Sequence, residues 1–375
     1  MSNDEELLIE TVRDFARHEL LPLDRACDLH EISIAQALPR LAEMGLLNLC
    51  LPENVGGLAC SLQTYARIIH EVSYASPSAA VTLSVHNMVG DILARHAPEP
   101  QRTHWLSRWG EADSLSAFAI SEAGAGSDAS SARTRAVPVE GGFRIAGEKM
   151  WITNGLSARW FLLLVQTDSA GTKTGLTAVV VDGREPGVER TAIKGKMGIR
   201  GSETIVLHLS DVFVQQSYQI GAMGEGLKVC LSTLNEGRIG IAAQATGIAE
   251  ACLDAMIAYA RQRTQFGRPI AEFQAIQNMV ADSAVELAAA RELTRRAAAL
   301  IDSGRHEPSG SSMAKLYATE SAGRIADRAV QVHGGTGYVH ECRVEQLYRD
   351  VRVTRIYEGT SEIQRLVIAR ELFGE

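Results

Sequence analysis

The sequence has no excess of basic residues. It carries 37 Lys and Arg residues against 45 Asp and Glu residues, a formal net charge of −8, and its isoelectric point is near 5.8. Nucleic acids and anionic membrane surfaces both select for a basic footprint. We therefore expect neither as the main partner, and any phosphate group must be met by a few local cations.

Cysteines are few and scattered. The sequence has six, with no Cys-x-x-Cys pair and no metal-type histidine spacing beside them, namely Cys27, Cys50, Cys60, Cys230, Cys252 and Cys342. This usage is typical of reduced intracellular thiols. We predict no metal site.

Long apolar runs are also missing. The polar start Ser2-Asn3-Asp4-Glu5-Glu6 leads directly into an amphipathic pattern, with no basic segment followed by an apolar one. We expect a soluble cytoplasmic protein with no membrane partner, or a protein of the mitochondrial matrix if a presequence has been removed. Internal repeats, low-complexity tracts and charged tails are not found either.

The apolar periodicity changes twice along the chain. At 375 residues the chain exceeds the length of a single hydrophobic core, so several subdomains are expected. Helical spacing, then short β-rich runs separated by turn residues, then long alanine-rich segments follow one another. The predicted fold class is α+β: an N-terminal helical domain at 1–113, a small antiparallel β domain at 114–225, and a C-terminal helical bundle at 226–375 with helices at about 226–262, 271–303 and 309–333.

Many outward positions of the predicted bundle are Ala, Leu or Val. This composition indicates a further face covered by another subunit, although a thick monomeric core would have the same composition.

One carboxylate near the C-terminus is a candidate general base. Glu358 lies between Tyr357 and Gly359, just before a predicted helix. A carboxyl held in a turn against apolar groups has its charged form disfavoured, so its pKa rises toward neutrality, as a general base requires.

Ser361 followed three residues later by Gln364 fits a capping box that opens the last helix. Glu358 is then in the preceding loop. The alternative is a glutamate that merely complements the positive end of that helix.

Four other segments have residue types suited to binding. Two glycines in 118–128 allow close backbone approach to a flat or phosphorylated ligand, although the pattern is no dinucleotide fingerprint and also fits an ordinary loop. A Trp and a Thr in 150–155 can contact a heteroaromatic ring or pack in the core. Arg263, followed by Phe266 and Gln274, can meet a pyrophosphate or satisfy a helix dipole. The glycines of 331–338 can face an anion or cap a helix.

Asn235 and Arg238 form a fifth pattern, because a spacing of three places them on one helix face. Together they can point into a cleft. Singly, each of the five patterns is weak.

Taken together, the five segments resemble the acyl-CoA dehydrogenase family, and its short-chain or short-branched-chain members in particular. The resemblance covers about residues 4 to 373, in the family's order and spacing. Its most specific parts are 119–128, 150–155, 263–267, 331–337 and 356–364.

The resemblance implies a role for each matching position. Glu358 is implied as the catalytic base. The residues implied to bind FAD within the chain are Phe118, Ile120, Ser121, Trp151, Thr153, Thr360 and Glu362. Those implied to hold the FAD of a neighbouring subunit are Arg263, Phe266, Gln274, Gln331 and Gly335. Those implied to bind substrate are Ser127, Asn235, Arg238, Tyr357 and Gly359, with Ser127 at the CoA part.

The activity implied is FAD-dependent α,β-dehydrogenation in fatty acid β-oxidation. Glu358 takes the α proton of an acyl-CoA, the β hydride passes to flavin N5, and a trans-2-enoyl-CoA leaves. The resemblance also implies a homotetramer, built as a dimer of dimers, and an electron-transferring flavoprotein as electron acceptor. Some relatives place the base at the position of Gly237, where a glycine cannot serve, and Glu236 is the fallback base here.

Three alternatives stay open. An acyl-CoA oxidase or flavin monooxygenase of the same fold would pass electrons to oxygen. A catalytically silent scaffold would bind flavin or CoA without chemistry, and a purely structural helical protein would bind neither.

Overall fold

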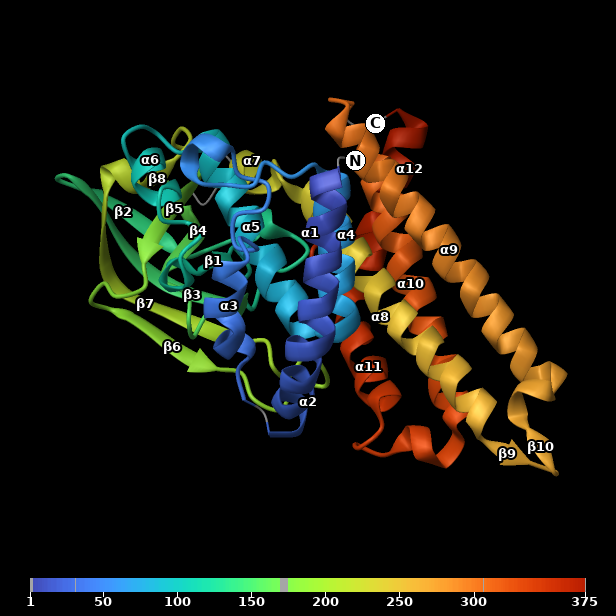
Figure 1. Ribbon diagram of the computed structural model, residues 1–375. Coiled ribbons are helices and arrows are strands. Elements are labelled where there is room, and N and C mark those ends of the chain that lie inside the picture. Colours follow the sequence, from blue (N-terminus) through green and yellow to red (C-terminus); the bar gives the residue numbers. More distant parts are fainter. Residues whose placement is uncertain (1–2, 31, 169–174, 306, 375) are drawn as a thin grey trace.

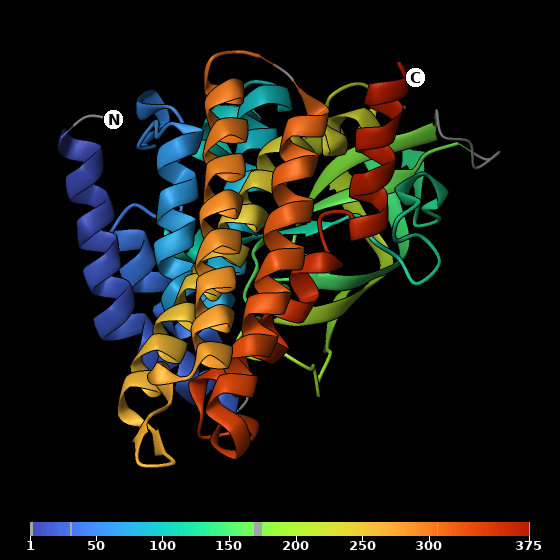
Figure 2. The same cartoon turned by 90° about the vertical axis from the view of Figure 1, so that its right-hand side faces the viewer.

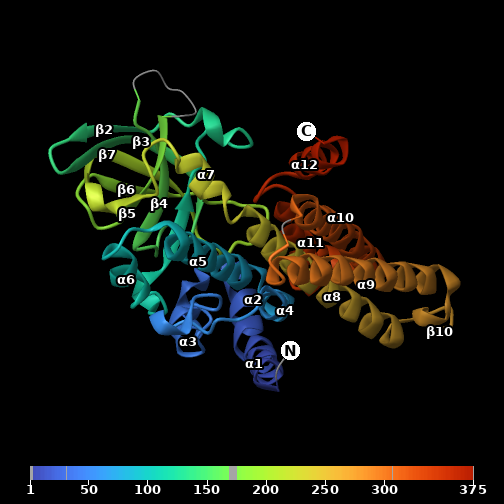
Figure 3. The ribbon, with the colours of Figure 1, turned by 90° about the horizontal axis from the view of Figure 1, so that it is seen from above.

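The computed structural model describes residues 3–30, 32–168, 175–305 and 307–374. Helices come first along the chain, then a sheet, then longer helices, so the predicted α+β class is confirmed. The sheet lies at one end of the molecule and the long C-terminal helices at the other, with the N-terminal helices packed against both (Figures 1 and 3).

The N-terminal helices begin and end where sequence signals place them. The Ser61 hydroxyl accepts from the Thr64 N–H, and the Ser76 hydroxyl accepts from the Ala79 N–H with Pro77 at the first helical position. The helices are α1 (Asn3–Phe15), a π-helical turn (Ala16–Leu20), α2 (Leu21–His30), α3 (Leu38–Glu43), α4 (Leu62–Ala75), α5 (Pro77–His96) and α6 (Gln101–Leu106).

The sheet corrects one prediction. Its strands are β1 (Ser116–Ala119), β2 (Arg135–Val139), β3 (Gly142–Thr153), β4 (Trp160–Gln166), β5 (Leu176–Asp182), β6 (Val188–Ala192), β7 (Thr204–Gln215) and β8 (Gln219–Ile220). Their order is β6-β7-β3-β2-β4-β5-β8, with β1 also paired to β4. The β1–β4 pairing is parallel, as is the single β2–β4 contact, so the sheet is mixed rather than antiparallel. The physical reason is that β1 arrives from the helices and not from a hairpin.

The C-terminal helices form a bundle, which Figure 2 shows from the side, along the length of the helices. They are α7 (Gly226–Leu231), α8 (Leu234–Gln262), α9 (Gln274–Asp302), α10 (Pro308–His333), α11 (Arg343–Val351) and α12 (Ser361–Phe373), with a small hairpin of β9 (Thr264–Gln265) and β10 (Arg268–Pro269) between α8 and α9. The predicted domain boundary after residue 113 falls within a short 3-10 helix, Ala112–Ser114, and the one after 225 falls at the start of α7. Both boundaries stay predictions.

One stretch corrects the expectation that no apolar run reaches membrane-spanning length. Residues 226–262 pass that test by length and composition among the described residues. In the 18-residue apolar window of this stretch, 72% is buried inside the fold, because α8 is the central helix against which α4, α9 and α10 pack. Its apolar character is that of a core helix.

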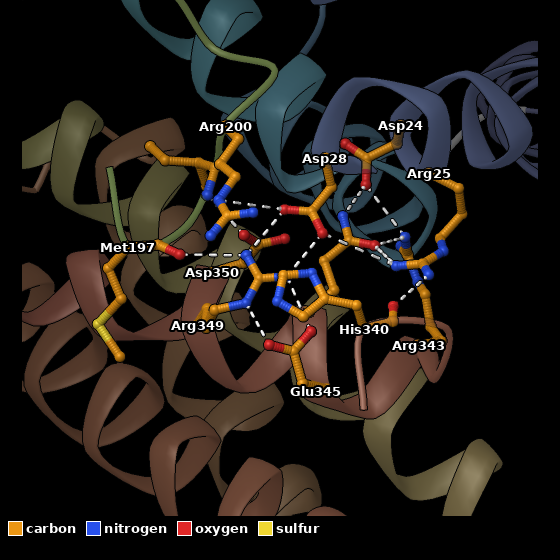
Figure 4. Close-up of polar contacts among 12 residues, drawn as sticks. Asp24, Arg25, Asp28, Met197, Arg200, His340, Arg343, Glu345, Arg349 and Asp350 are labelled. Atoms are coloured by element: carbon orange, nitrogen blue, oxygen red, sulfur yellow. Dashed lines mark hydrogen bonds and ion pairs between the residues drawn. The ribbon is translucent and has the colours of Figure 1, made fainter. Parts of the chain in front are cut away.

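A buried ion network joins the N-terminal helices, the β region and α11 (Figure 4). Asp28 of α2 accepts two hydrogen bonds from Arg349, at 2.8 and 2.6 Å, and Arg349 also donates to the Met197 carbonyl at 3.1 Å. Burial by itself raises the pKa of Asp28, but the hydrogen bonds and charge of Arg349 outweigh it and hold that pKa below its ordinary value. The network therefore stabilises the fold only while both partners are present.

We expect Arg349→Met to lower the free energy of unfolding by about 3–5 kcal/mol, because it leaves Asp28 buried without its main partner. Urea unfolding followed by circular dichroism measures this. Arg108→Met is the matched control, because Arg108 pairs with Glu111 at the surface, where such a pair contributes at most about 1 kcal/mol. Equal losses in the two variants would contradict the network's role.

Candidate active site

Glu358 lies in the loop between a 3-10 helix, Arg352–Arg355, and α12. Its backbone φ is +53°, in the left-handed region that a non-glycine residue rarely adopts. Such a conformation persists where the surroundings enforce it. Glu358 is therefore held in an unusual backbone position, just ahead of the last helix.

The start of that helix corrects a prediction. Thr360, rather than Ser361, is the N-cap of α12, and its side chain accepts from the Ile363 N–H. Ser361 is the first helical residue, and its hydroxyl donates to Glu320 at 2.7 Å. Spacing misplaced the cap by one residue because Thr360 and Ser361 are both good capping residues, and only the tertiary partner of Ser361 separates them.

A buried lysine fixes the backbone on both sides of Glu358. The Lys315 side chain on α10 is fully buried, and its Nζ donates to the Tyr357 carbonyl at 2.9 Å and to the Gly359 carbonyl. From the other side, the Gln364 amide donates to the carbonyls of Glu358 and Gly359, at 3.2 and 2.9 Å. These bonds set the direction of the Glu358 side chain.

The Glu358 carboxylate rests against the backbone of α8. A Cβ built on Gly237 would lie 3.1 Å from Glu358 Oε2 and 3.3 Å from the Met88 sulfur. Gly237 thus leaves the room that the carboxylate occupies. A larger side chain there would press on the carboxylate.

Burial dominates the electrostatics of this carboxylate. It raises the pKa of Glu358, and the positive charges of Lys315 and Arg238 offset only part of that shift. Burial also lowers the pKa of Lys315 to about 8, against the attraction of Glu358. A carboxylate with a raised pKa beside two cations is suited to proton abstraction near neutral pH.

Three predicted substrate residues surround this point. Arg238 is 7% exposed, and its Nη1 donates to Asn235 Oδ1 at 3.0 Å, so the two residues meet as the spacing indicated. The Tyr357 hydroxyl donates to Gln244 Oε1 on α8. By contrast, the fallback base Glu236 is engaged by Arg95 at 3.0 Å.

Of the residues predicted to line the flavin, Phe118 lies on β1, Ile120 and Ser121 directly follow it, and Trp151 and Thr153 lie on β3. The Met150 N–H donates to the Ser121 carbonyl at 2.9 Å, which brings the segment Phe118–Ser121 beside Trp151 and Thr153. Trp151 has a φ of +65° where the β3–β7 register shifts, and it is 59% exposed. The bulge turns the indole outward, so Trp151 is not a core residue.

Sequence reasoning missed the ion pair beneath this surface. Lys149 is fully buried, and its Nζ contacts Glu122 at 2.7 Å and the Leu164 carbonyl at 2.6 Å. Glu122 also accepts from the N–H groups of Arg133 and Thr134, which closes the loop that contains the exposed Ser127. Strand alternation counted from the buried Phe143 and Ile145 puts position 149 on the same face, and that signal could have found it.

The residues predicted to hold the FAD of a neighbouring subunit lie far from this surface. They are all exposed, at the end of the bundle that carries β9 and β10, and are Arg263, Phe266, Gln274, Gln331 and Gly335. The stacking of Tyr259 on His333, with ring centroids 4.3 Å apart, joins the ends of α8 and α10 there. Figures 1 and 3 show this end opposite the sheet. Phe266 is 93% exposed. One chain therefore separates the two groups of predicted cofactor residues.

Sequence profiles of known families match almost the whole chain. The N-terminal, middle and C-terminal domains of acyl-CoA dehydrogenase match residues 2–113, 117–212 and 224–373. The chain belongs to the acyl-CoA dehydrogenase family. It is accordingly a flavin-dependent oxidoreductase that acts on the CH–CH bond of acyl-CoA thioesters, with FAD as its cofactor.

Individual relatives agree over the full length. The mitochondrial short-chain specific acyl-CoA dehydrogenase of Homo sapiens is 40% identical over 98% of this chain and 89% of its own. The butyryl-CoA dehydrogenase structure from Megasphaera elsdenii is 32% identical, covers 100% of this chain and 99% of that one, and superposes with a TM-score of 0.96. A chain solved in work on the electron-transferring flavoprotein of Acidaminococcus fermentans is 33% identical, with coverage of 100% and 99% and a TM-score of 0.97.

We expect Lys315→Met to slow flavin reduction by acyl-CoA at least about tenfold, because Glu358, the candidate base, loses its backbone anchor. The charge of Lys315 lowers the pKa of Glu358, so its removal raises that pKa further. The acidic limb of the rate profile should therefore move to higher pH, because the base is protonated over a wider range. Stopped-flow flavin bleaching across pH measures both effects.

Two comparisons separate positioning from simple instability. Lys315→Arg keeps the charge and should restore the wild-type acidic limb, and Lys228→Met removes an exposed lysine as a control. An unmoved limb in Lys315→Met, with normal FAD content, would contradict the role given to Lys315.

Proposed function

We propose that this protein dehydrogenates a short acyl-CoA to the trans-2-enoyl-CoA, with Glu358 as the catalytic base. The observation that carries the proposal is the placement of Glu358. Its carboxylate lies against Gly237 at a raised pKa, in a strained loop held by Lys315. Strain of this kind is characteristic of functional sites.

The proton step follows from this geometry. The α carbon of a thioester is a very weak acid, so the base must be poised in a site that excludes water while the oxygen of the developing enolate is stabilised. The Glu358 backbone N–H donates to no group among the described residues, and we assign it as the protein donor to that oxygen. When bound, FAD supplies the acceptor of the β hydride at its N5 atom.

Arg238 is the proposed substrate-orienting residue. One of its terminal nitrogens is already fixed by Asn235, and its Nε has no partner in the described chain. A buried guanidinium with spare donors is well suited to hold a polar thioester group or to orient the base. Tyr357 and Gly359 are proposed to line the substrate site on either side of Glu358. Their carbonyls accept hydrogen bonds from the Lys315 ammonium, which fixes their positions.

The residues on β1 and β3 fit the flavin. The outward Trp151 on its bulge offers a flat aromatic face, and Thr153 follows on the same strand. Beside them, the exposed Ser127 is proposed to meet the CoA part of the substrate. Thr360 and Glu362, at the start of α12, are proposed to contact the cofactor within the chain.

The distant group of cofactor residues supports a site shared between two copies. Arg263, Phe266, Gln274, Gln331 and Gly335 are exposed at the end opposite the sheet, so we propose that they bind the FAD of a neighbouring copy. A homotetramer built as a dimer of dimers satisfies this arrangement. We further propose an electron-transferring flavoprotein as the electron acceptor and a cytoplasmic location.

Replacement of Glu358 by Gln should preserve the fold and the bound FAD but reduce flavin bleaching by acyl-CoA at least about a thousandfold, because the amide cannot accept the proton. Anaerobic single-turnover absorbance is the measurement. Glu341→Gln, at an exposed carboxylate, serves as control. Substantial turnover in Glu358→Gln would require another base.

The oxidase alternative is separated by a second assay, run in air with wild-type enzyme. If air-saturated wild-type enzyme consumes oxygen with release of peroxide at the rate of substrate oxidation, the protein is an oxidase. If only an added flavoprotein acceptor sustains turnover, it is a dehydrogenase. Coloured protein that binds acyl-CoA and never bleaches would be the silent scaffold.

A shared site predicts complementation between two inactive variants. A chain with Glu358→Gln and a chain with Arg263→Ala each fail alone, but co-expression yields hybrids in which one site combines an intact Glu358 with an intact neighbouring Arg263. About half of the sites in such a hybrid dimer should be active. Each variant chain carries a different affinity tag, so that hybrids can be purified over both tags. The activity of these hybrids tests the prediction.

Hybrids with no activity above that of the single variants would place the whole site within one chain. Co-expression of two differently tagged Glu358→Gln chains gives the background for that comparison.

A further inference from the structure

A cavity of about 180 Å³ adjoins the proposed base. Gly237 and Met88 line it, and a Cβ built on Gly237 would lie within 3.3 Å of both Glu358 Oε2 and the Met88 sulfur. Tyr65 and Asn87 line it beside Met88. An acyl chain whose α carbon faces Glu358 can therefore extend into this cavity.

The lining combines apolar side chains, Leu62 and Ile301 among them, with a cluster of charges. Asp91, Arg95 and Glu236 all border the cavity. The Arg95 guanidinium lies 2.7 Å from an Asp91 oxygen and 3.0 Å from Glu236 Oε1. Two carboxylates share one guanidinium, so the cluster carries an excess of negative charge.

Two oxygens of the lining have no hydrogen-bond partner in the described chain. They are Glu236 Oε2 and Thr233 Oγ1, and Thr233 is fully buried. Burial raises the pKa of Asp91 to about 6, although Arg95 opposes that shift. A buried acceptor left without a donor costs about 1–3 kcal/mol, so an aliphatic chain end would leave that cost in place.

We propose that the acyl group of the substrate ends in an uncharged hydrogen-bond donor, such as a hydroxyl, which binds at this cluster. This rests on the proposed function, because it assigns the far end of the same substrate. A hydroxyl donates to the unpartnered acceptors, whereas an alkyl end satisfies none of them. A carboxylate end meets two like charges and is rejected.

The experiment uses five-carbon thioesters that differ only at the far end: pentanoyl-CoA, 5-hydroxypentanoyl-CoA and glutaryl-CoA, with four- and six-carbon sets beside them. The dissociation constants are measured by titration calorimetry on FAD-loaded Glu358→Gln, which does not turn over. The hydroxyl compound of the best length should bind at least about tenfold more tightly than its alkyl match, and the carboxylate compound most weakly.

Two variants in the Glu358→Gln background assign the preference to the cluster. Asp91→Leu with Arg95→Leu and Glu236→Met replaces the cluster by apolar groups of similar size, and should reverse the hydroxyl preference. Glu236→Gln keeps the shape of the side chain and removes one negative charge, so it should strengthen glutaryl-CoA binding. The FAD content of the triple variant shows whether that variant is folded.

The outcomes separate the two proposals. Alkyl binding equal to or tighter than hydroxyl binding, or glutaryl-CoA binding tightest, overturns the inference. If the hydroxyl compound binds most tightly but no thioester bleaches the wild-type flavin, the inference stands and the proposed dehydrogenation fails.

Discussion

The Lys315 ammonium makes the hydrogen bonds on which the position of Glu358 depends. It holds the carbonyls of Tyr357 and Gly359, so the residue between them has little freedom in its backbone. The positive φ of Glu358 then becomes a property of the packed molecule rather than of the local sequence. Because the ammonium is fully buried, these carbonyls and the nearby carboxylate are what make its burial tolerable.

The same burial sets the chemistry of the carboxylate. Without Lys315 and Arg238, burial would favour the neutral acid strongly, and a neutral acid cannot accept a proton. With them, the pKa of Glu358 stays raised but is partly restrained. Gly237 adds the space for the carboxylate, so one glycine, two cations and a tight loop define the position and charge of the candidate base.

Trp151 and Thr153 lie on β3, and Arg263 and Phe266 flank β9; β3 and β9 are at opposite ends of the molecule (Figures 1 and 3). Arg349 on α11 donates to Asp28 on α2 and to the Met197 carbonyl. These hydrogen bonds hold the β region against the helices. The two groups of predicted cofactor residues therefore lie at opposite ends of one chain, which is the arrangement that the proposed shared site requires.

The order of the elements and the candidate base could be predicted from the sequence, because both depend on local chemistry. The changes of apolar period determined the order of helices and strands, and the short motif around Glu358 determined the candidate base. The tertiary structure decided the parallel pairing of β1, the cap at Thr360 and the partners of Lys149 and Lys315. Lys315 and Tyr357 are 42 positions apart, and no periodicity or propensity encodes which distant backbone carbonyl a buried cation will meet.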